Sequence, residues 1–191
     1  MPTTCEIRIG EKSWTAFSGN ITFDQFFQEE QTVTITASGS GPVTIEYLLR
    51  DRAFAMDELD EAAFTPYTGE LRLDLNHAYV VYAKLTDASG NVTYINSDEI
   101  VLDAVAPVIS GIESGKTYCP AHTVTVTELY LDSVTVNGTD TPIDENGQFT
   151  LSLPAGEKRV IATDKAGNVS AEMIVTAVSY THLTLPTITR V

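Results

Sequence analysis

Hydrophobic and polar residues alternate along most of this chain. In residues 123–127, which read Thr-Val-Thr-Val-Thr, the two valines would face one side and the three threonines the other. A period of two is the pattern of a β-strand with one buried face and one solvated face. The same alternation predicts strands at residues 31–38, 43–50, 78–86, 122–128, 132–138 and 147–153.

Turn-forming residues separate these predicted strands. Ser-Gly-Ser-Gly stands at 38–41, Asn-Gly at 137–138 and again at 146–147, and Pro-Ala-Gly at 154–156. Turn signals at intervals of roughly eight to twelve residues are typical of antiparallel sandwiches. We therefore expect an all-β fold.

Residues 55–64 are the exception to this pattern. Alanines favour a helix there, Asp57 is a candidate N-cap, and Glu58 and Glu61 place negative charge in the first turn. We expect a short helix near 56–62, inserted between strands of a first domain. The acidic side chains of this segment could bind a cation or form a solvated helix face, and we favour the solvated face.

The pattern changes at residues 101–112, where we expect a domain boundary. A strand ends at Asp103, and Pro107 favours an extended conformation of the residue before it. No Gly/Ser run follows, so the linker should be short. We expect a first Ig-like domain at 1–104 and a second at 105–177.

One acidic hexad, Asp-x-x-Gly-Asn-Val, occurs twice in the chain, at 87–92 and at 164–169. An Asp that begins a turn accepts backbone N–H bonds two residues on, and a following Gly takes the positive φ that closes the loop. An alternating strand precedes and follows each copy. The predicted residues of these structural hairpin turns are Asp87, Gly90, Asn91, Asp164, Gly167 and Asn168.

Two other interpretations of the hexad remain open. A calcium loop needs oxygen ligands at alternating positions, but each Asp stands alone and Lys165 would place a cation beside the site. Asn91 and Asn168 also begin two of the four Asn-x-Ser/Thr sequences that match a glycosylation acceptor. Turn chemistry selects Asn for its own reasons, so the hairpin is favoured over both.

The charge balance of the chain argues against one class of partner. The chain has 26 acidic and 11 basic residues, a formal net charge of −15. Phosphate binding needs clustered Lys and Arg, so no nucleic-acid partner is expected. No apolar run approaches the ~20 residues of a membrane helix, and the first residues show no signal peptide.

Few residues suit catalysis. His77, His122 and His182 are the only histidines, and no nucleophile elbow, zinc motif or phosphate-binding loop occurs. Cys5 and Cys119 fall one in each expected domain, which favours two isolated thiols. We expect no catalytic residues, no cofactor and no metal, and we expect His77 and His122 at edges or loops.

Two short sequences carry a resemblance to a known family. Val-Thr-Val-Asn-Gly ends at Gly138 and Ala-Thr-Asp-Lys-Ala-Gly-Asn ends at Asn168. With these, residues 107–177 resemble a bacterial Ig-like repeat of the Big type, and residues 3–104 resemble a companion module. The resemblance implies tandem Ig-like antiparallel β-sandwiches in a large cell-surface or secreted protein of Firmicutes.

The same resemblance implies a function without chemistry of its own. The chain would be a non-catalytic spacer, stalk or adhesion module outside the cell, with neighbouring Ig-like repeats and a host or glycan surface as partners. The alternative is a set of accessory modules, linking or carbohydrate-binding, of a secreted carbohydrate-active enzyme. A glycan-binding face would need exposed aromatic residues. We expect the one cluster of these to fill the core of the first domain; it comprises Trp14, Phe17, Phe23, Phe26 and Phe27.

The last residues stand apart from the rest. Residues 178–187 read Val-Ser-Tyr-Thr-His-Leu-Thr-Leu-Pro-Thr and resemble the translation of an adapter used in DNA sequencing. We therefore expect residues 178–191 to be a non-native tail on a metagenomic fragment.

Overall fold

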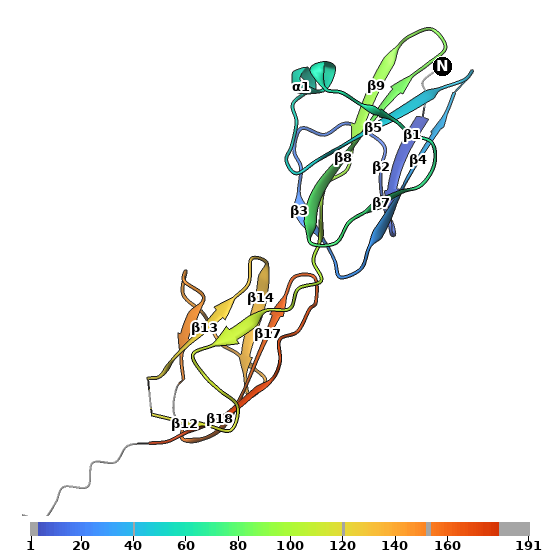
Figure 1. Ribbon diagram of the computed structural model, residues 1–191. Helices are drawn as coiled ribbons and strands as arrows, with labels where there is room; N and C mark the ends of the chain where they lie inside the picture. The colour runs from blue at the N-terminus through green and yellow to red at the C-terminus, as the bar shows by residue number, and fades with distance from the viewer. Residues whose placement is uncertain (1–3, 40, 120, 152–153, 180–191) are drawn as a thin grey trace, which may run out of the picture. The chain divides into compact units, whose positions relative to one another are not determined.

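The computed structural model describes residues 4–39, 41–119, 121–151 and 154–179. The chain divides into two compact units, a first unit of Met1–Val105 and a second unit of Ala106–Val191 (Figure 1). Each unit holds its own pair of β-sheets, which confirms the expected all-β class and the two sandwiches.

The first unit begins with a four-stranded sheet, as far as the described residues show. The strand order in this sheet is β2-β1-β4-β7, and all of its pairs are antiparallel. The strands are β1 (Thr4–Ile9), β2 (Lys12–Trp14), β4 (Gln31–Ser38) and β7 (Leu71–Leu73).

The other sheet of the first unit has six strands within the described part of the chain. The order is β3-β10-β8-β5-β6, and β9 pairs with the second half of β8. The strands are β3 (Phe23–Phe27), β5 (Thr44–Arg50), β6 (Thr65–Pro66), β8 (His77–Thr86), β9 (Val92–Asn96) and β10 (Glu99–Leu102).

The main core of the first unit lies between these two sheets. The alternation of β1 shows which residues enter this core. Cys5, Ile7 and Ile9 are buried, whereas Thr4, which precedes Cys5, and Arg8, which lies between the two isoleucines, are exposed. The opposite sheet contributes apolar residues of β8 and β10. Full burial of each such aliphatic side chain stabilises the fold by about 1.5–3 kcal/mol relative to leaving it exposed.

A second, smaller cluster lies on the outer face of the six-stranded sheet. Leu48 of β5 and both Val80 and Tyr82 of β8 pack there with Leu59 of the only described helix, α1 (Met56–Glu61). The inserted helix is confirmed, but Asp57 is not its cap. Ala55 is the N-cap, and its N–H donates to Oε2 of Glu58 at 2.9 Å.

The second unit is a smaller sandwich of three- and five-stranded sheets, as judged from its described residues. The orders are β11-β13-β16 and β12-β18-β17-β14-β15. The first sheet contains β11 (Val108–Ser110), β13 (Thr123–Thr127) and β16 (Gln148–Thr150). The second contains β12 (Thr117–Tyr118), β14 (Leu131–Val136), β15 (Thr139–Asp140), β17 (Gly156–Asp164) and β18 (Met173–Ala177).

The core of the second unit follows the predicted pattern. Val124 and Val126 of β13 are buried, whereas Thr123 and Thr127 are exposed. These valines pack with Phe149 of β16 and with apolar residues of the opposite sheet. The alternation in the sequence therefore predicts correctly which residues of β13 are buried.

Most of the described strand pairs are antiparallel, as expected, and two pairs are parallel. In the first unit β3 runs parallel to β10, and in the second β12 runs parallel to β18. In both units a short strand from the N-terminal part of the unit lies beside its last strand. This pairing gives the last strand a partner on its open side, which would otherwise present unpaired backbone groups.

The start of the expected tail belongs to the second unit. The N–H of Val178 donates to the carbonyl of Tyr118 at 3.0 Å, which extends the pairing of β12 with β18 by one residue. The remainder of the expected tail, beyond Ser179, lies outside the described residues. Among the described residues, no helix is long and apolar enough to cross a membrane.

Candidate functional site

The predicted turn of the first unit joins β8 to β9. Oδ1 of Asp87 accepts the backbone N–H groups of Ser89 at 2.8 Å and Asn91 at 3.0 Å, and Oδ2 accepts the side-chain amide of Asn91 at 2.8 Å. Gly90 has φ of 83° and donates to the carbonyl of Asp87 at 2.9 Å. The side-chain and backbone hydrogen bonds from Asn91 hold the pKa of Asp87 below its ordinary value.

The second copy of the hexad repeats this geometry at the end of β17. Oδ1 of Asp164 accepts the N–H of Asn168 at 2.8 Å, and Oδ2 accepts its side-chain amide at 2.8 Å. Gly167 has φ of 92° and donates to the carbonyl of Asp164 at 3.1 Å. The two carboxylates differ in burial, because Asp164 is 2% exposed whereas Asp87 is half-buried.

A third turn of the same kind, from Asp144 to Gln148, leads into β16. Oδ1 of Asp144 accepts the N–H groups of Asn146 at 2.9 Å and Gln148 at 2.8 Å, and Gly147 has φ of 71°. The sequence predicts a turn at Asn146-Gly147 but not its likeness to the hexad, because Gln148 stands where the other copies have Asn. The turn therefore depends on Asp and Gly, and the Asn adds a further bond.

A serine repeats in the two units beyond the hexad. Oγ of Ser97 accepts the N–H of Val81 at 2.9 Å, while the N–H of Ser97 donates to the carbonyl of Val81 at 2.9 Å. Ser170 makes the equivalent pair of bonds with Ala162, at 3.0 and 2.9 Å. Both serines are buried, so each side chain satisfies a backbone N–H that water would not reach. No sequence pattern had singled them out.

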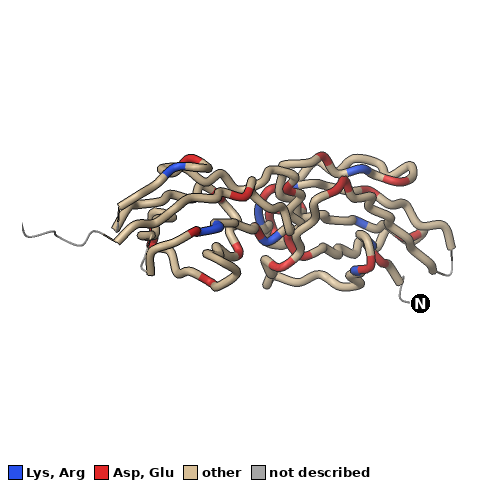
Figure 2. Tube along the Cα trace, turned by 90° about the horizontal axis from the view of Figure 1, so that it is seen from below, with Lys and Arg blue, Asp and Glu red and all other residues tan. Residues whose placement is uncertain are grey.

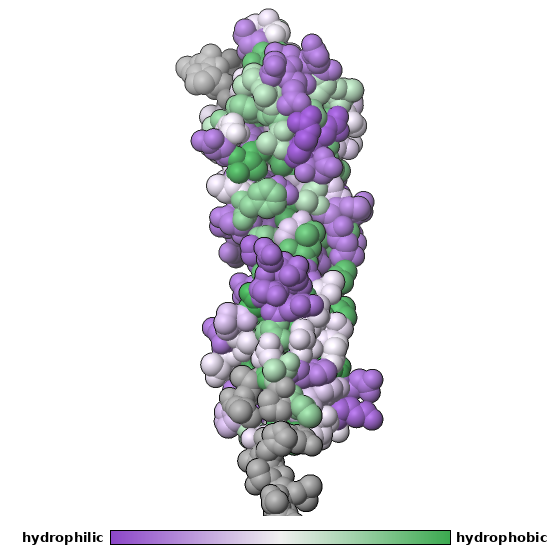
Figure 3. Space-filling model, turned by 90° about the vertical axis from the view of Figure 1, so that its left-hand side faces the viewer, coloured by the Kyte–Doolittle hydropathy of each residue, from purple (hydrophilic) through white to green (hydrophobic). Residues whose placement is uncertain are grey.

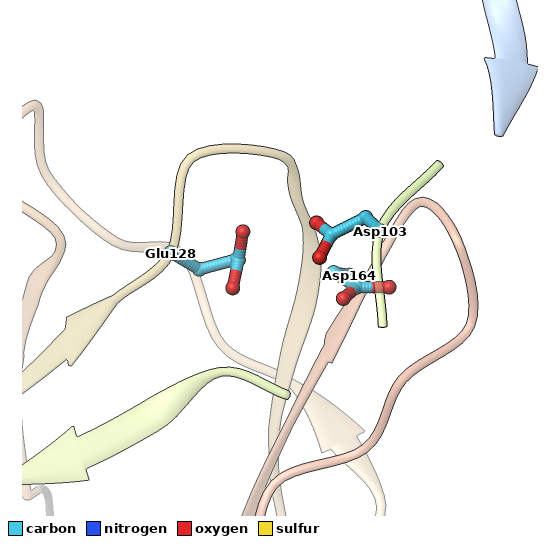
Figure 4. Close-up of side chains that lie close together, drawn as sticks. All are labelled: Asp103, Glu128 and Asp164. Atoms are coloured by element: carbon cyan, nitrogen blue, oxygen red, sulfur yellow. The ribbon is translucent and has the colours of Figure 1, made fainter. Parts of the chain in front are cut away.

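Two carboxylates of the second unit lie close together. Glu128, which follows β13, and Asp164 have ligand oxygens within 4.8 Å of each other (Figure 4). Oε1 of Glu128 accepts the N–H of Tyr130 at 3.0 Å, and both oxygens of Asp164 accept bonds from Asn168. N–H groups of neighbouring residues thus already occupy some of the hydrogen-bonding positions of these two carboxylates. The pair supplies fewer oxygens than the about six to eight of a calcium site.

Asp103, which Figure 4 also labels, forms part of the end of the first unit. Its N–H donates to the carbonyl of Phe27 at 2.8 Å, and its Oδ1 accepts the N–H of Val105 at 2.9 Å. The second bond closes a local turn after β10, which is a common role for Asp.

Charged and aromatic side chains cover the outer face of the first unit next to α1. Arg52 makes two hydrogen bonds to the carboxylate of Glu58, at 2.6 and 3.3 Å, and lies 4.2 Å from the ring centroid of Phe54. The N–H of Phe54 in turn donates to the hydroxyl of Tyr82 at 2.6 Å. Burial raises the pKa of Tyr82. This arrangement fixes the inserted segment on the sheet.

The predicted aromatic cluster divides between core and surface. Trp14 and Phe27 pack against the main core and Phe17 against the outer cluster, but Phe23 is 61% exposed. On the face shown in Figure 3, apolar and polar side chains are interspersed. Trp14 also donates from its indole nitrogen to Oδ2 of Asp98 at 2.9 Å, so its ring is held in place.

Two grooves among the described residues are lined by charged side chains of both signs and are candidate binding sites. One, of about 350 Å³, lies in the first unit and is lined by Leu49, Arg50, Asp51, His77, Ala78 and Tyr79. The other, of about 370 Å³, lies on the five-stranded sheet of the second unit, where Arg159 forms ion pairs with Glu157 and Glu172. Acidic residues are spread over both units, and basic ones are fewer (Figure 2).

The histidines and cysteines assemble no catalytic group within the described part of the chain. His77 begins β8, and Nε2 of His122 is 2.7 Å from the carbonyl oxygen of Gly111. Both cysteines are free, with Cys5 buried and Cys119 exposed. Burial raises the pKa of the Cys5 thiol to about 11, so this thiol is a poor nucleophile at neutral pH.

One protein family matches part of the chain. The model described as "Glucodextranase, domain B" matches residues 107–180, which is less than half of the sequence. No curated protein matches the sequence.

Solved structures resemble the chain only distantly. SGBP-B of the Bacteroides ovatus mixed-linkage glucan utilization locus, solved in complex with a mixed-linkage heptasaccharide, gives a TM-score of 0.35 at 12% identity over 90% of this chain. This chain spans 47% of that protein. Fibronectin(III)-like modules of Clostridium thermocellum CbhA give 0.36 at 13% identity, over 91% of this chain and 93% of that one. Murine CEACAM1b gives 0.45 at 10% identity, over 81% of this chain and 95% of that one.

These structural likenesses carry no argument about function at such TM-scores. The family match is independent of them, falls on the second unit and fits a non-catalytic accessory Ig-like module. The second unit is therefore similar to a non-catalytic Ig-like module, and the first unit lies outside the match.

Proposed function

We propose that the chain is a pair of non-catalytic, Ig-like accessory modules of an extracellular protein that acts on carbohydrate. The observation that carries this proposal is the match of residues 107–180 to domain B of a glucodextranase. That description names one domain of an enzyme. By this proposal the chemistry is performed by another domain of the same protein.

The use of the polar groups supports a structural role. The carboxylate of each turn Asp accepts hydrogen bonds from N–H groups of its own turn, at Asp87, Asp144 and Asp164. The two buried serines bond to the neighbouring strand. Among the described residues, no buried side-chain nitrogen or oxygen is left without a hydrogen-bond partner. Rigid modules that hold other domains apart need polar groups that are hydrogen-bonded within the module, rather than reactive groups.

The match to a domain of a carbohydrate-degrading enzyme supports a place outside the cell. A net charge of −15 keeps a secreted protein soluble and opposes binding to nucleic acid. The proposed location is therefore the cell surface or the medium.

A spacer, stalk or adhesion module is the second candidate, and a specific observation favours it. The two units carry the same Asp-Gly-Asn turn with the same two bonds from the Asn, as tandem repeats of one module would. In this case the partners would be neighbouring Ig-like repeats, and a host or glycan surface would be the target.

The complete gene, read from one unbroken long sequence, distinguishes the two candidates. A catalytic domain for glycosidic bonds in the same reading frame supports the accessory function. Further Ig-like repeats and a wall anchor, with no such domain, would contradict it and support the stalk. The same sequence decides whether residues 178–191 are native and whether the source is a member of the Firmicutes.

A further inference from the structure

The groove of the first unit has the composition of a small binding site. It opens where β5 ends and β8 begins, because the register pairs Arg50 with Val80 and so brings Asp51 close to the first residues of β8. Its volume of about 350 Å³ falls at the lower end of the range of roughly 300–1,000 Å³ for ligand pockets. A site of this size suits one or two sugar units rather than a long chain.

Hydrogen-bonding groups of both kinds line the groove. The carboxylate of Asp51 is an acceptor on an exposed residue, and within the described part of the chain its side chain makes no hydrogen bond or ion pair. The guanidinium of Arg50 donates to the carbonyl of Leu49 at 2.9 Å and lies 5.2 Å from the ring centroid of Phe54. A guanidinium has five N–H donors, so this single bond leaves others for a ligand.

An aromatic pair borders the same groove. The rings of His77 and Tyr79 lie 6.0 Å apart between centroids and meet edge to face, at 69°. Leu49 and Ala78 supply apolar surface beside them. A sugar ring has apolar C–H faces and polar hydroxyl edges, so it can use both parts of such a lining.

The charges of the groove favour a neutral ligand. Arg50 and Asp51 are adjacent and opposite in sign, so neither a polyanion nor a polycation gains a strong field here. The net charge of −15 further opposes acidic polysaccharides at low ionic strength. Among polyhydroxylated ligands, neutral sugars remain.

We propose that this groove binds a neutral oligosaccharide, with Asp51 and Arg50 hydrogen-bonded to its hydroxyls and the His77–Tyr79 pair against an apolar sugar face. The proposal rests on the proposed carbohydrate-related function and deepens it. It gives the first unit, which the family match does not reach, a carbohydrate contact of its own.

Titration of the full chain with neutral oligosaccharides tests this site. The probes are isomaltoheptaose, maltoheptaose and a mixed-linkage glucan heptasaccharide, followed by calorimetry and by amide chemical shifts in NMR. Asp51→Ala and His77→Ala alter exposed side chains, and unchanged unfolding midpoints would show that both variants fold. Asp132→Ala, an exposed Asp of β14, is the matched control.

The expected result is binding of at least one probe, with shifts concentrated at residues 49–51 and 77–79. Each groove variant should weaken that binding by about tenfold, and the control should not weaken it. Asp51→Ala loses a hydrogen bond to a charged group, and His77→Ala loses the aromatic contact with the apolar sugar face. No binding to any probe, or shifts confined to Arg159 and its neighbours in the second unit, would overturn the proposal. A catalytic domain in the complete gene with no binding here would refute this site and leave the accessory function standing.

Discussion

The side-chain amide of Asn91 donates a hydrogen bond of 2.8 Å to the carboxylate of Asp87, and this bond closes the turn between β8 and β9. Asn168 makes the same bond to Asp164. The Asn of the repeated hexad thus has a structural role, as a hydrogen-bond donor to the carboxylate that precedes it. The two bonds differ in surroundings, because Asp164 is buried and Asp87 is not.

Asn168→Ala should destabilise the second unit by about 2 kcal/mol, because it leaves a buried carboxylate with fewer donors. Asn91→Ala should have a smaller effect, since water can replace the lost donor at Asp87. Urea unfolding followed by circular dichroism measures both. Asn146→Ala is the control, because the exposed side chain of Asn146 makes no such bond to Asp144, and it should change stability by less than about 0.5 kcal/mol. Equal losses for Asn91→Ala and Asn168→Ala would contradict this account.

Gly147 and Gly90 allow the cost of positive φ to be separated from the cost of a clash. A Cβ on Gly147 would lie 2.3 Å from the carbonyl oxygen of Val126, whereas a Cβ on Gly90 meets nothing within 4 Å. Gly90→Ala should therefore lower the free energy of unfolding by about 1–2 kcal/mol, which is the cost of placing a residue with a Cβ in the left-handed conformation. Gly147→Ala should cost more than about 3 kcal/mol, because β13 must move away.

The measurement for this pair is again urea unfolding, with a separate signal for each unit. Trp14 is the only tryptophan, so its fluorescence reports the first unit, and circular dichroism reports both. Gly90→Ala should shift the fluorescence transition, and Gly147→Ala should leave it in place while the other transition moves. A smaller loss for Gly147→Ala than for Gly90→Ala would show that the turn at Asp144 adapts.

The sequence predicted those parts of the fold that alternation and turn chemistry control. Val124 and Val126 between threonines define β13, and the Asp-Gly spacing defines the turns. β10 carries no alternation, because all four of its residues are buried, and the two residues of β12 are too short for any periodic signal. Their parallel pairings depend on where distant segments meet, which local patterns do not encode.

Local sequence patterns could not predict the candidate groove, for the same reason. His77 and Asp51 are brought together by the register of β5 on β8, and neither residue belongs to a motif. The closeness of Glu128 to Asp164 likewise depends on how the second unit packs. Asp57 was expected as the helix cap from its residue type, but the backbone enters the helix two residues earlier, at Ala55.

Glu99→Gln should stabilise the first unit at neutral pH. Glu99 is 5% exposed, and burial, together with the nearby charge of Asp51, raises the pKa of its carboxyl group. Because the folded pKa lies above the unfolded one, folding favours the protonated form, and the charged form weakens the fold as pH rises through the folded pKa. The amide carries no charge, so the gain at pH 7 should be on the order of 0.5–1 kcal/mol after solvent screening.

The pH profile of Trp14 fluorescence in urea checks this sign. The advantage of Glu99→Gln should fall as pH falls through the folded pKa of Glu99 and should disappear below the unfolded pKa. Glu70→Gln, at an exposed position, should show no such advantage. If Glu99→Gln instead lowered stability at pH 7, the carboxylate would have a stabilising partner that burial does not reveal.

Asp98 should behave in the opposite way. Its burial alone would raise its pKa, but hydrogen bonds from the backbone of Thr22 and the indole of Trp14, at 2.9 Å each, hold the pKa of Asp98 below its ordinary value. A depressed carboxyl pKa contributes stability that is present above the unfolded pKa and is lost as pH falls through the folded one. Asp98→Ala should therefore cost about 2 kcal/mol at pH 7 and progressively less in acid.

Asp98→Asn is the matched variant for this prediction, because it keeps one acceptor oxygen and removes the charge. It should lose less than Asp98→Ala at pH 7 and should show a flatter pH profile. The indole N–H of Trp14 offers a direct readout in NMR, where its exchange with solvent should accelerate in Asp98→Ala. A protected indole N–H together with unchanged stability in Asp98→Ala would show that packing of the Trp14 ring, and not its bond to Asp98, holds this segment on the core.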